Sequence, residues 1–203
     1  MTAHEFWLLD LDGTILGVEE DYIHETIEAV GDRIDRQFTD DEAVAIWYGR
    51  DGLRDDILQQ YEVDPADFWV AFHDIESPKR RAEATYLHDD AGVITDLDGP
   101  RAVVTHCQPY LLEPILHRLE IGAWFDAIVT GSDRLGWKPD PAPLEHAMAK
   151  LNINGERGAM VGDSVADVQA ASNAGVTGIL VDRDGTTPSD DADHIVTSLE
   201  ELI

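Results

Sequence analysis

Residues 6–14 of this 203-residue chain are Phe6-Trp7-Leu8-Leu9-Asp10-Leu11-Asp12-Gly13-Thr14. The first four are apolar, which predicts a short buried strand. Asp10 and the glycine that follows three positions later indicate that the strand ends there in a loop. The segment therefore predicts a strand whose carboxyl end carries two aspartates, and the rest of the chain can be interpreted around it.

Beyond about residue 90 the pattern alternates between strands and helices. Apolar, β-branched runs predict strands over 101–105, 125–130, 159–161, 176–181 and 194–196. Between them, helical periodicity predicts helices over 110–119, 144–151 and 165–174. Such alternation is typical of a parallel sheet flanked by helices. We therefore expect an α/β fold with a doubly wound, Rossmann-like core.

The segment from about 19 to 88 has a different pattern, with apolar residues at helical spacing. Thr39 or Asp40 before Glu42 indicates one helix start, and Asp64 before Pro65 indicates another. We expect this whole segment to be helical. The predicted organisation is a core domain of residues 1–16 and 89–203, interrupted after its first strand by a helical cap domain of residues 17–88.

The composition is strongly acidic. Asp and Glu number 42 against 14 Lys and Arg, for a formal net charge of −28. Too few cations are present to bind nucleic acid or an anionic membrane through a basic surface. Such an acidic, lysine-poor chain resembles proteins of salt-loving organisms, where salt screens the repulsion between carboxylates; an acidic mesophilic protein is the alternative.

Other features of the sequence bear on localisation. Cys107 is the sole cysteine, so no internal disulfide can form. The sequence shows no apolar run of membrane-spanning length and no basic-then-apolar signal layout at its start. These features predict a cytoplasmic protein that does not associate with membranes.

Polar residues follow each predicted core strand, at the edge where doubly wound sheets carry their functional groups. They are Asp10-Leu11-Asp12, Thr105-His106, Lys138-Pro139-Asp140-Pro141, and Gly162-Asp163-Ser164-Val165-Ala166-Asp167. Four converging carboxylates would repel one another unless a hard cation such as Mg²⁺ bound between them. The Thr105 hydroxyl, Lys138 and the backbone amides around Leu11 and Asp12 would suit phosphate oxygens.

These four segments, in this order, resemble the four motifs of the haloacid dehalogenase-like superfamily, and the resemblance spans Asp10 to Asp167. It implies that Asp10 is a nucleophile that forms an aspartyl-phosphate, and that Asp12 is the general acid and base. Thr105 would bind the phosphoryl group and Lys138 would steady it.

The same resemblance assigns the metal and the cap. The implied Mg²⁺ ligands are Asp10, Asp163 and the backbone carbonyl of Asp12, with Asp167 in or near the metal shell. The helical insert would be a mobile cap that closes over the substrate. The phosphoglycolate phosphatase-like branch is the most similar, and with the acidic composition it suggests a protein of a halophilic archaeon.

Asp12 favours a phosphatase over a dehalogenase, because a haloacid has no leaving oxygen to protonate. We therefore expect a Mg²⁺-dependent phosphatase acting on a small phosphorylated metabolite, as a monomer or homodimer. A phosphosugar mutase, a pyrophosphatase or a dehalogenase are alternative enzymes. A non-catalytic relative that binds phosphate ligands or a partner protein is the alternative outside the enzyme class.

Some residues near these motifs have two interpretations. His106 stands where the family often has Asn, and either contacts substrate or is structural. Arg50 and Arg54 either reach an anionic substrate from the cap or pair with surface acids. Cys107 is expected to pack, and residues 96–99, which repeat the letters Asp-Leu-Asp-Gly, to form a turn before the second core strand. Residues 17–19, Gly-Val-Glu, depart from the Asp-Ser pair of many relatives, which leaves the cap hinge open.

Overall fold

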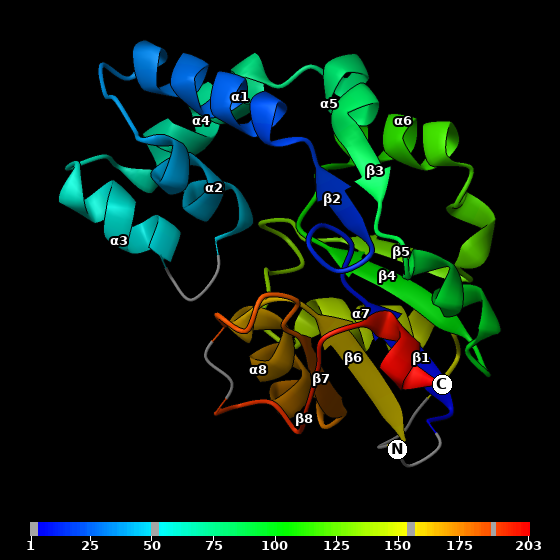
Figure 1. Cartoon of the computed structure of the whole chain (residues 1–203). Coiled ribbons are helices and arrows are strands. Elements are labelled where there is room, and N and C mark those ends of the chain that lie inside the picture. The colour runs from blue at the N-terminus through cyan, green and yellow to red at the C-terminus, as the bar shows by residue number, and fades with distance from the viewer. Residues whose placement is uncertain (1–3, 50–52, 154–156, 188–189) are drawn as a thin grey trace.

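A computed structural model describes residues 4–49, 53–153, 157–187 and 190–203. Its centre is a six-stranded sheet in which every neighbouring pair of strands is parallel (Figure 1). From one edge to the other the strands are β5 (Ala127–Thr130), β4 (Arg101–Thr105), β1 (Phe6–Leu9), β6 (Gly158–Gly162), β7 (Thr177–Val181) and β8 (His194–Val196). The predicted α/β fold with a doubly wound sheet is confirmed.

Strand β1 lies in the middle of the sheet and is buried on both faces. Successive side chains of a strand point to opposite faces. Trp7 and Leu9 accordingly belong to one apolar cluster, and Phe6 and Leu8 to another. This two-sided burial explains why the strand is a continuous apolar run rather than an alternating one.

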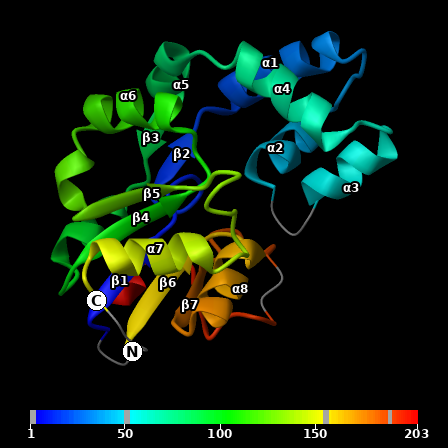
Figure 2. The same cartoon turned by 180° about the vertical axis from the view of Figure 1, so that it is seen from behind.

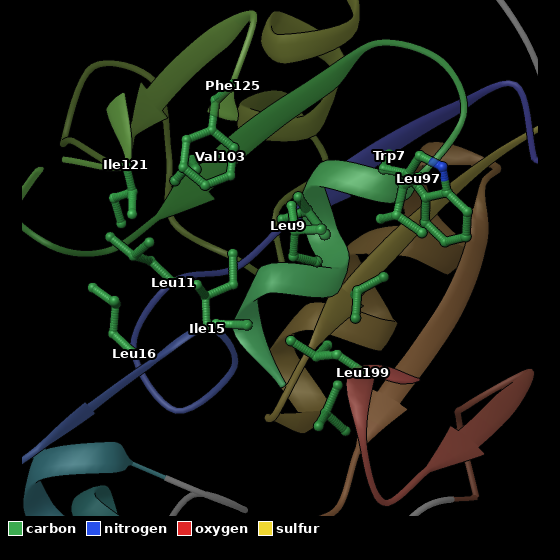
Figure 3. Packing of buried hydrophobic residues seen from close by; sticks show 14 of the residues in the cluster. Trp7, Leu9, Leu11, Ile15, Leu16, Leu97, Val103, Ile121, Phe125 and Leu199 are labelled. Atoms are coloured by element: carbon green, nitrogen blue, oxygen red, sulfur yellow. The ribbon is translucent and has the colours of Figure 1, made fainter. Parts of the chain in front are cut away.

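Helices cover both faces of the sheet. One face carries α6 (Pro109–Leu119) and the 3₁₀ helices η2 (Ala91–Asp96) and η4 (Leu199–Leu202), whose apolar residues join the cluster of Trp7 and Leu9 (Figure 3). The other carries α7 (Ala142–Lys150) and α8 (Val165–Ala174), which pack against Phe6 and Leu8 (Figure 2). A further 3₁₀ turn, η3 (Gly122–Trp124), precedes β5.

In the described part of residues 16–87, five helices lie between two short strands. They are β2 (Leu16–Val18), α1 (Glu20–Arg33), α2 (Asp40–Tyr48), α3 (Leu53–Gln60), α4 (Pro65–Ile75), α5 (Pro78–Ala84) and β3 (Thr85–Leu87). Helices α1 to α4 pack around an apolar cluster of their own that includes Ile27, Ile46 and Phe68. Both predicted helix starts are confirmed: Thr39 forms a capping box with Glu42, and Asp64 accepts from the Ala66 N–H before Pro65.

The expectation that residues 19–88 are entirely helical is wrong at the end of the segment. Thr85–Leu87 forms β3, which pairs antiparallel with β2. Thr85 is β-branched and Tyr86 aromatic, and both residue types favour strands. Gly17, opposite Tyr86, makes the pairing possible, because a Cβ there would lie 2.4 Å from the Tyr86 ring.

The repeated Asp-Leu-Asp-Gly letters at 96–99 lie directly before β4, at the opposite end of the strand from Thr105. Gly99 has a φ of 92°, a conformation that favours glycine. The prediction of a turn is confirmed. Among the described residues, no helix is both long and apolar enough to cross a membrane.

Candidate active site

The carboxyl ends of β1, β4 and β6 lie side by side, because these strands are parallel neighbours. Asp10 directly follows β1, Thr105 ends β4, and Asp163 directly follows β6. The Asp10 N–H donates to the Val161 carbonyl at 2.8 Å, which continues the pairing of β1 with β6 into the loop. The strands themselves therefore bring three of the predicted site residues to one edge of the sheet.

Asp10, Asp163 and Asp167 form a buried acidic cluster, with one carboxylate oxygen from each lying within 4.8 Å of the others. Burial raises the pKa of Asp10 well above its usual range; Lys138 opposes this rise, and the charges of Asp167 and Asp163 add to it. These are hard oxygen ligands of the kind that Mg²⁺ takes. The donor set therefore fits a divalent cation.

Lys138 lies inside this cluster. Its Nζ is 2.5 Å from Asp10 Oδ1 and 2.6 Å from Asp167 Oδ1, and it donates to the Val104 carbonyl at 2.9 Å. Burial acts to lower the pKa of Lys138, but the two carboxylates outweigh it and the pKa is raised. One lysine against three aspartates leaves an excess of negative charge, which a bound cation would offset.

Two local features hold the aspartates in place. Gly13 has a φ of 86°, and a Cβ there would lie 2.1 Å from Asp163 Oδ2, so glycine makes room for that carboxylate. Asp167 Oδ2 accepts from the Ser164 N–H at 3.1 Å and from its hydroxyl at 2.6 Å, a capping box at the start of α8. Asp167 thus caps a helix with one oxygen and contacts Lys138 with the other.

His106 contacts the backbone of Lys138. The Lys138 backbone N–H donates to His106 Nε2 at 2.9 Å, which requires an unprotonated Nε2 and therefore a neutral ring. Desolvation of the ring, followed by the nearby Lys138 charge, lowers the pKa of His106 to about 3. This hydrogen bond connects His106 to the loop that carries Lys138, and a contact of His106 with substrate stays a prediction.

Thr105 and Cys107 lie next to His106. The Thr105 hydroxyl accepts from the Cys107 N–H at 3.0 Å, and Cys107 packs against the apolar cluster around Leu9, as expected. The Leu11 side chain is buried in that same cluster, so any contact of Leu11 with phosphate would be through its backbone. The roles of Thr105 and Leu11 toward phosphate stay predictions, as does the carbonyl of Asp12 as a metal ligand.

Of the two arginines predicted to reach substrate from the cap, the structure describes one. Arg50 lies outside the described residues. Arg54 donates to the Ile46 and Trp47 carbonyls at 2.5 and 2.7 Å, and so binds the carboxyl-terminal end of α2. Its charge also contributes to the lowered pKa of His106, which indicates proximity to the core. A substrate contact by Arg54 stays a prediction.

Sequence reasoning missed Arg81, which contacts Asp12 directly. Arg81 Nη2 donates to Asp12 Oδ1 at 2.6 Å, and the Arg81 side chain is 2% exposed whereas that of Asp12 is 26% exposed. Arg81 lies in a Lys-Arg-Arg run that is typical of a solvated helix face. Its burial depends on the packing of several helices, which one helix's residue pattern does not reveal.

Comparisons with known proteins identify the family to which the chain is similar. Residues 7–181 match the family model of the haloacid dehalogenase-like hydrolases. The chain is 30% identical over 209 aligned residues to the plasmid phosphoglycolate phosphatase of Cupriavidus necator, covering 96% of this chain and 90% of that one. It is 28% identical to the phosphoglycolate phosphatase of Pectobacterium atrosepticum, with 86% and 79% covered.

Solved structures agree on the fold. A predicted phosphatase from Clostridium acetobutylicum superposes with a TM-score of 0.80 at 23% identity, covering 99% of this chain and 97% of that one. A HAD phosphatase from Thermococcus onnurineus gives 0.71 at 22% identity, covering 98% and 95%. With the family match over residues 7–181 and a strand-end site of the expected composition, the chain belongs to the haloacid dehalogenase-like hydrolases.

Proposed function

We propose that this hydrolase is a Mg²⁺-dependent phosphatase that hydrolyses a small phosphorylated metabolite. The observation that carries the proposal is the buried cluster of Asp10, Asp163 and Asp167 around Lys138, with the partly exposed Asp12 two positions after Asp10. Curated relatives named phosphoglycolate phosphatases support the same reaction class. Phosphoglycolate is therefore the first substrate to test.

In the proposed reaction Asp10 attacks phosphorus, forming a P–O bond to its carboxylate while the bond to the ester oxygen breaks. Asp12 donates a proton to that leaving oxygen, and then accepts one from the water that hydrolyses the aspartyl-phosphate. Lys138, 2.5 Å from Asp10, holds the nucleophile and offsets negative charge. Bound Mg²⁺ would supply electrostatic stabilisation of the phosphoryl oxygens.

Asp12 also bears on the alternatives. A haloacid dehalogenase has no leaving oxygen to protonate, so a partly exposed carboxylate here supports a phosphatase. A mutase would return the phosphoryl group from Asp10 to a second hydroxyl rather than to water. Release of inorganic phosphate distinguishes these reactions.

Residues 17–88 are proposed to act as the cap domain, since α1 to α4 have a separate apolar cluster and β2 and β3 connect them to the core. The acidic composition supports an origin in a salt-loving organism. The protein is further proposed to be cytoplasmic and to act as a monomer or homodimer. Cooperative folding without added salt would argue against that origin.

The test is phosphate release from a panel of small phosphate esters, led by phosphoglycolate, in high KCl with and without Mg²⁺. We expect release that depends on Mg²⁺ and is lost in Asp10→Asn. A folded protein that binds Mg²⁺ but releases no phosphate from any ester would contradict the proposal.

A further inference from the structure

The buried Arg81 makes its contact with the core through Asp12. Arg81 lies on α5, whereas Asp12 lies in the loop after β1. A buried ion pair is weak evidence for stability, because removing both charges from water costs about as much as their attraction returns. The role of Arg81 is therefore better inferred from its position beside Asp12, the proposed acid and base.

The Arg81 guanidinium is held from several directions. Its Nη1 donates to the Thr85 hydroxyl at 2.9 Å, and its Nε is 3.9 Å from Glu76 Oε1. The Trp47 ring lies against it, with the guanidinium carbon 4.9 Å from the ring centroid. Contacts from α2, from the residue that ends α4 and from β3 thus restrict it to one orientation.

This restricted group is in turn connected to the core. Arg118, on α6, donates to the Thr85 carbonyl at 2.8 Å, and α5 packs against α6. A planar guanidinium fixed in this way imposes a direction on the carboxylate that it binds. Catalytic side chains held by such supporting contacts reach the productive geometry more often than free ones.

We propose that Arg81 is a positioning residue that orients Asp12 for proton transfer. Resting on the proposed function, the inference is that Arg81 holds Oδ1 and leaves Oδ2 to carry the proton. In the first step Oδ2 gives its proton to the ester oxygen as the bond from that oxygen to phosphorus breaks.

The test compares two small phosphates that differ in their need for an acid. Ethyl phosphate releases an alkoxide that must be protonated, whereas acetyl phosphate releases acetate, which is stable unprotonated. In Arg81→Met, we expect kcat/KM for ethyl phosphate to fall by about 10- to 100-fold, part of the 10²- to 10⁴-fold typical of general acid catalysis. For acetyl phosphate kcat/KM should stay within about threefold of the wild-type value.

Arg80→Met is the matched control. Arg80 is the neighbouring residue on the same helix, but it is exposed and pairs with Glu25. This variant should keep the wild-type ratio of the two kcat/KM values. An equal loss on both substrates in Arg81→Met would show that Arg81 serves the fold alone and would overturn the inference.

A double-mutant cycle with Asp12→Asn completes the test. The measured quantity is again kcat/KM, which covers the steps up to phosphoryl transfer and not the later attack of water that both substrates share. Asp12→Asn should itself lower kcat/KM selectively for ethyl phosphate. Adding Arg81→Met should not change the ratio further, because the residue that Arg81 positions is already disabled. A further selective loss in the double variant would contradict the inference. If Arg81→Met does not fold by circular dichroism, the same ratio in Arg81→Lys decides, since lysine keeps the charge without the planar fork.

The outcomes separate the inference from the proposed function. Absence of phosphate release from every compound of the panel by the wild-type protein would count against the phosphatase mechanism. A kcat/KM that Asp12→Asn lowers equally for ethyl phosphate and acetyl phosphate would count against it as well. A working phosphatase whose ratio is unchanged in Arg81→Met would reject Arg81 alone.

Discussion

Two clusters of charged side chains lie near the loop after β1, and they differ in their net charge. At the strand ends, three aspartates lie close together and Lys138 contacts two of them, Asp10 and Asp167; burial and the charges of the other two aspartates both raise the pKa of Asp10. On the cap side, Asp12 and Glu76 share Arg81, and burial raises the pKa of Glu76 to about 7, so that this second cluster approaches neutrality when Glu76 is protonated. The first cluster suits an incoming cation and phosphate, whereas the second suits the fixing of a side chain.

The largest expected effect removes the nucleophile from the strand-end cluster. Asp10→Asn should lower turnover by about 10⁴-fold or more, the size of loss seen when a nucleophile is removed. The measurement is phosphate release with the best ester of the panel. Circular dichroism should show an unchanged fold, and turnover at the wild-type rate would exclude Asp10 as the nucleophile.

The next largest effect tests whether Lys138 offsets the negative charge of the aspartates. Lys138→Met leaves Asp10 and Asp167 buried without their cation, which should cost about 3–5 kcal/mol in the free energy of unfolding without Mg²⁺. Urea denaturation at constant salt measures it, and added Mg²⁺ should restore part of the loss. Lys150→Met, at an exposed position, is the control; a cost equal to the control's would contradict this charge balance.

On the cap side, the effect depends on pH. The pKa of Glu76 is raised from 4.5 to about 7 by burial, against the opposing charge of Arg81 and with a contribution from Asp12. The unfolded carboxyl loses its proton from about pH 4.5 upward while the folded one keeps it. The contribution of Glu76 to the free energy of unfolding is therefore fully present below pH 4.5 and is lost as the pH rises to 7. The loss is about 3 kcal/mol, at about 1.36 kcal/mol for each unit of pKa shift.

Glu76→Gln removes this titration. Relative to wild type, its free energy of unfolding should therefore rise by about 3 kcal/mol between pH 4.5 and 7. Denaturant titrations across this range measure the difference. Glu83→Gln, which changes an exposed carboxylate, should show no such trend. Parallel pH profiles of stability for wild type and Glu76→Gln would show that the pKa of Glu76 is not raised in the folded protein.

The smallest effect concerns the support of Lys138. His106→Ala removes the acceptor of the Lys138 N–H and should cost about 1 kcal/mol of stability, the usual net value of one hydrogen bond. His117→Ala, an exposed control, should cost less. Because the His106 ring is neutral, its titration should not change turnover between pH 6 and 8. A change in turnover over this pH range that is present in wild type and absent in His106→Ala would contradict this role.

The sequence predicted the strand-end cluster well and the cap-side cluster poorly. Each residue of the strand-end cluster lies next to a strand end or a helix start that the sequence pattern predicts: Asp10, Lys138, Asp163 and Asp167. Parallel strands bring their carboxyl ends to one edge of the sheet, which places these residues together. Arg81 and Asp12 are 69 positions apart, and their contact depends on how α2, α4 and α5 pack. Propensity along one segment carries no information about such a contact, which is also why the β3 pairing with Gly17 was missed.

The β2–β3 ribbon has a consequence for how the chain is connected. The Glu19 N–H donates to the Ala84 carbonyl and the His88 N–H to the Ile15 carbonyl, so the chain leaves the core and returns to it at neighbouring points. Helices α1 to α5 thus lie in the connection between the two strands of one antiparallel pair, β2 and β3. The entropy of closing a loop grows only slowly with its length. The architecture can thus accommodate inserts of different size and shape at this position while the six-stranded sheet and its strand-end residues keep their connectivity.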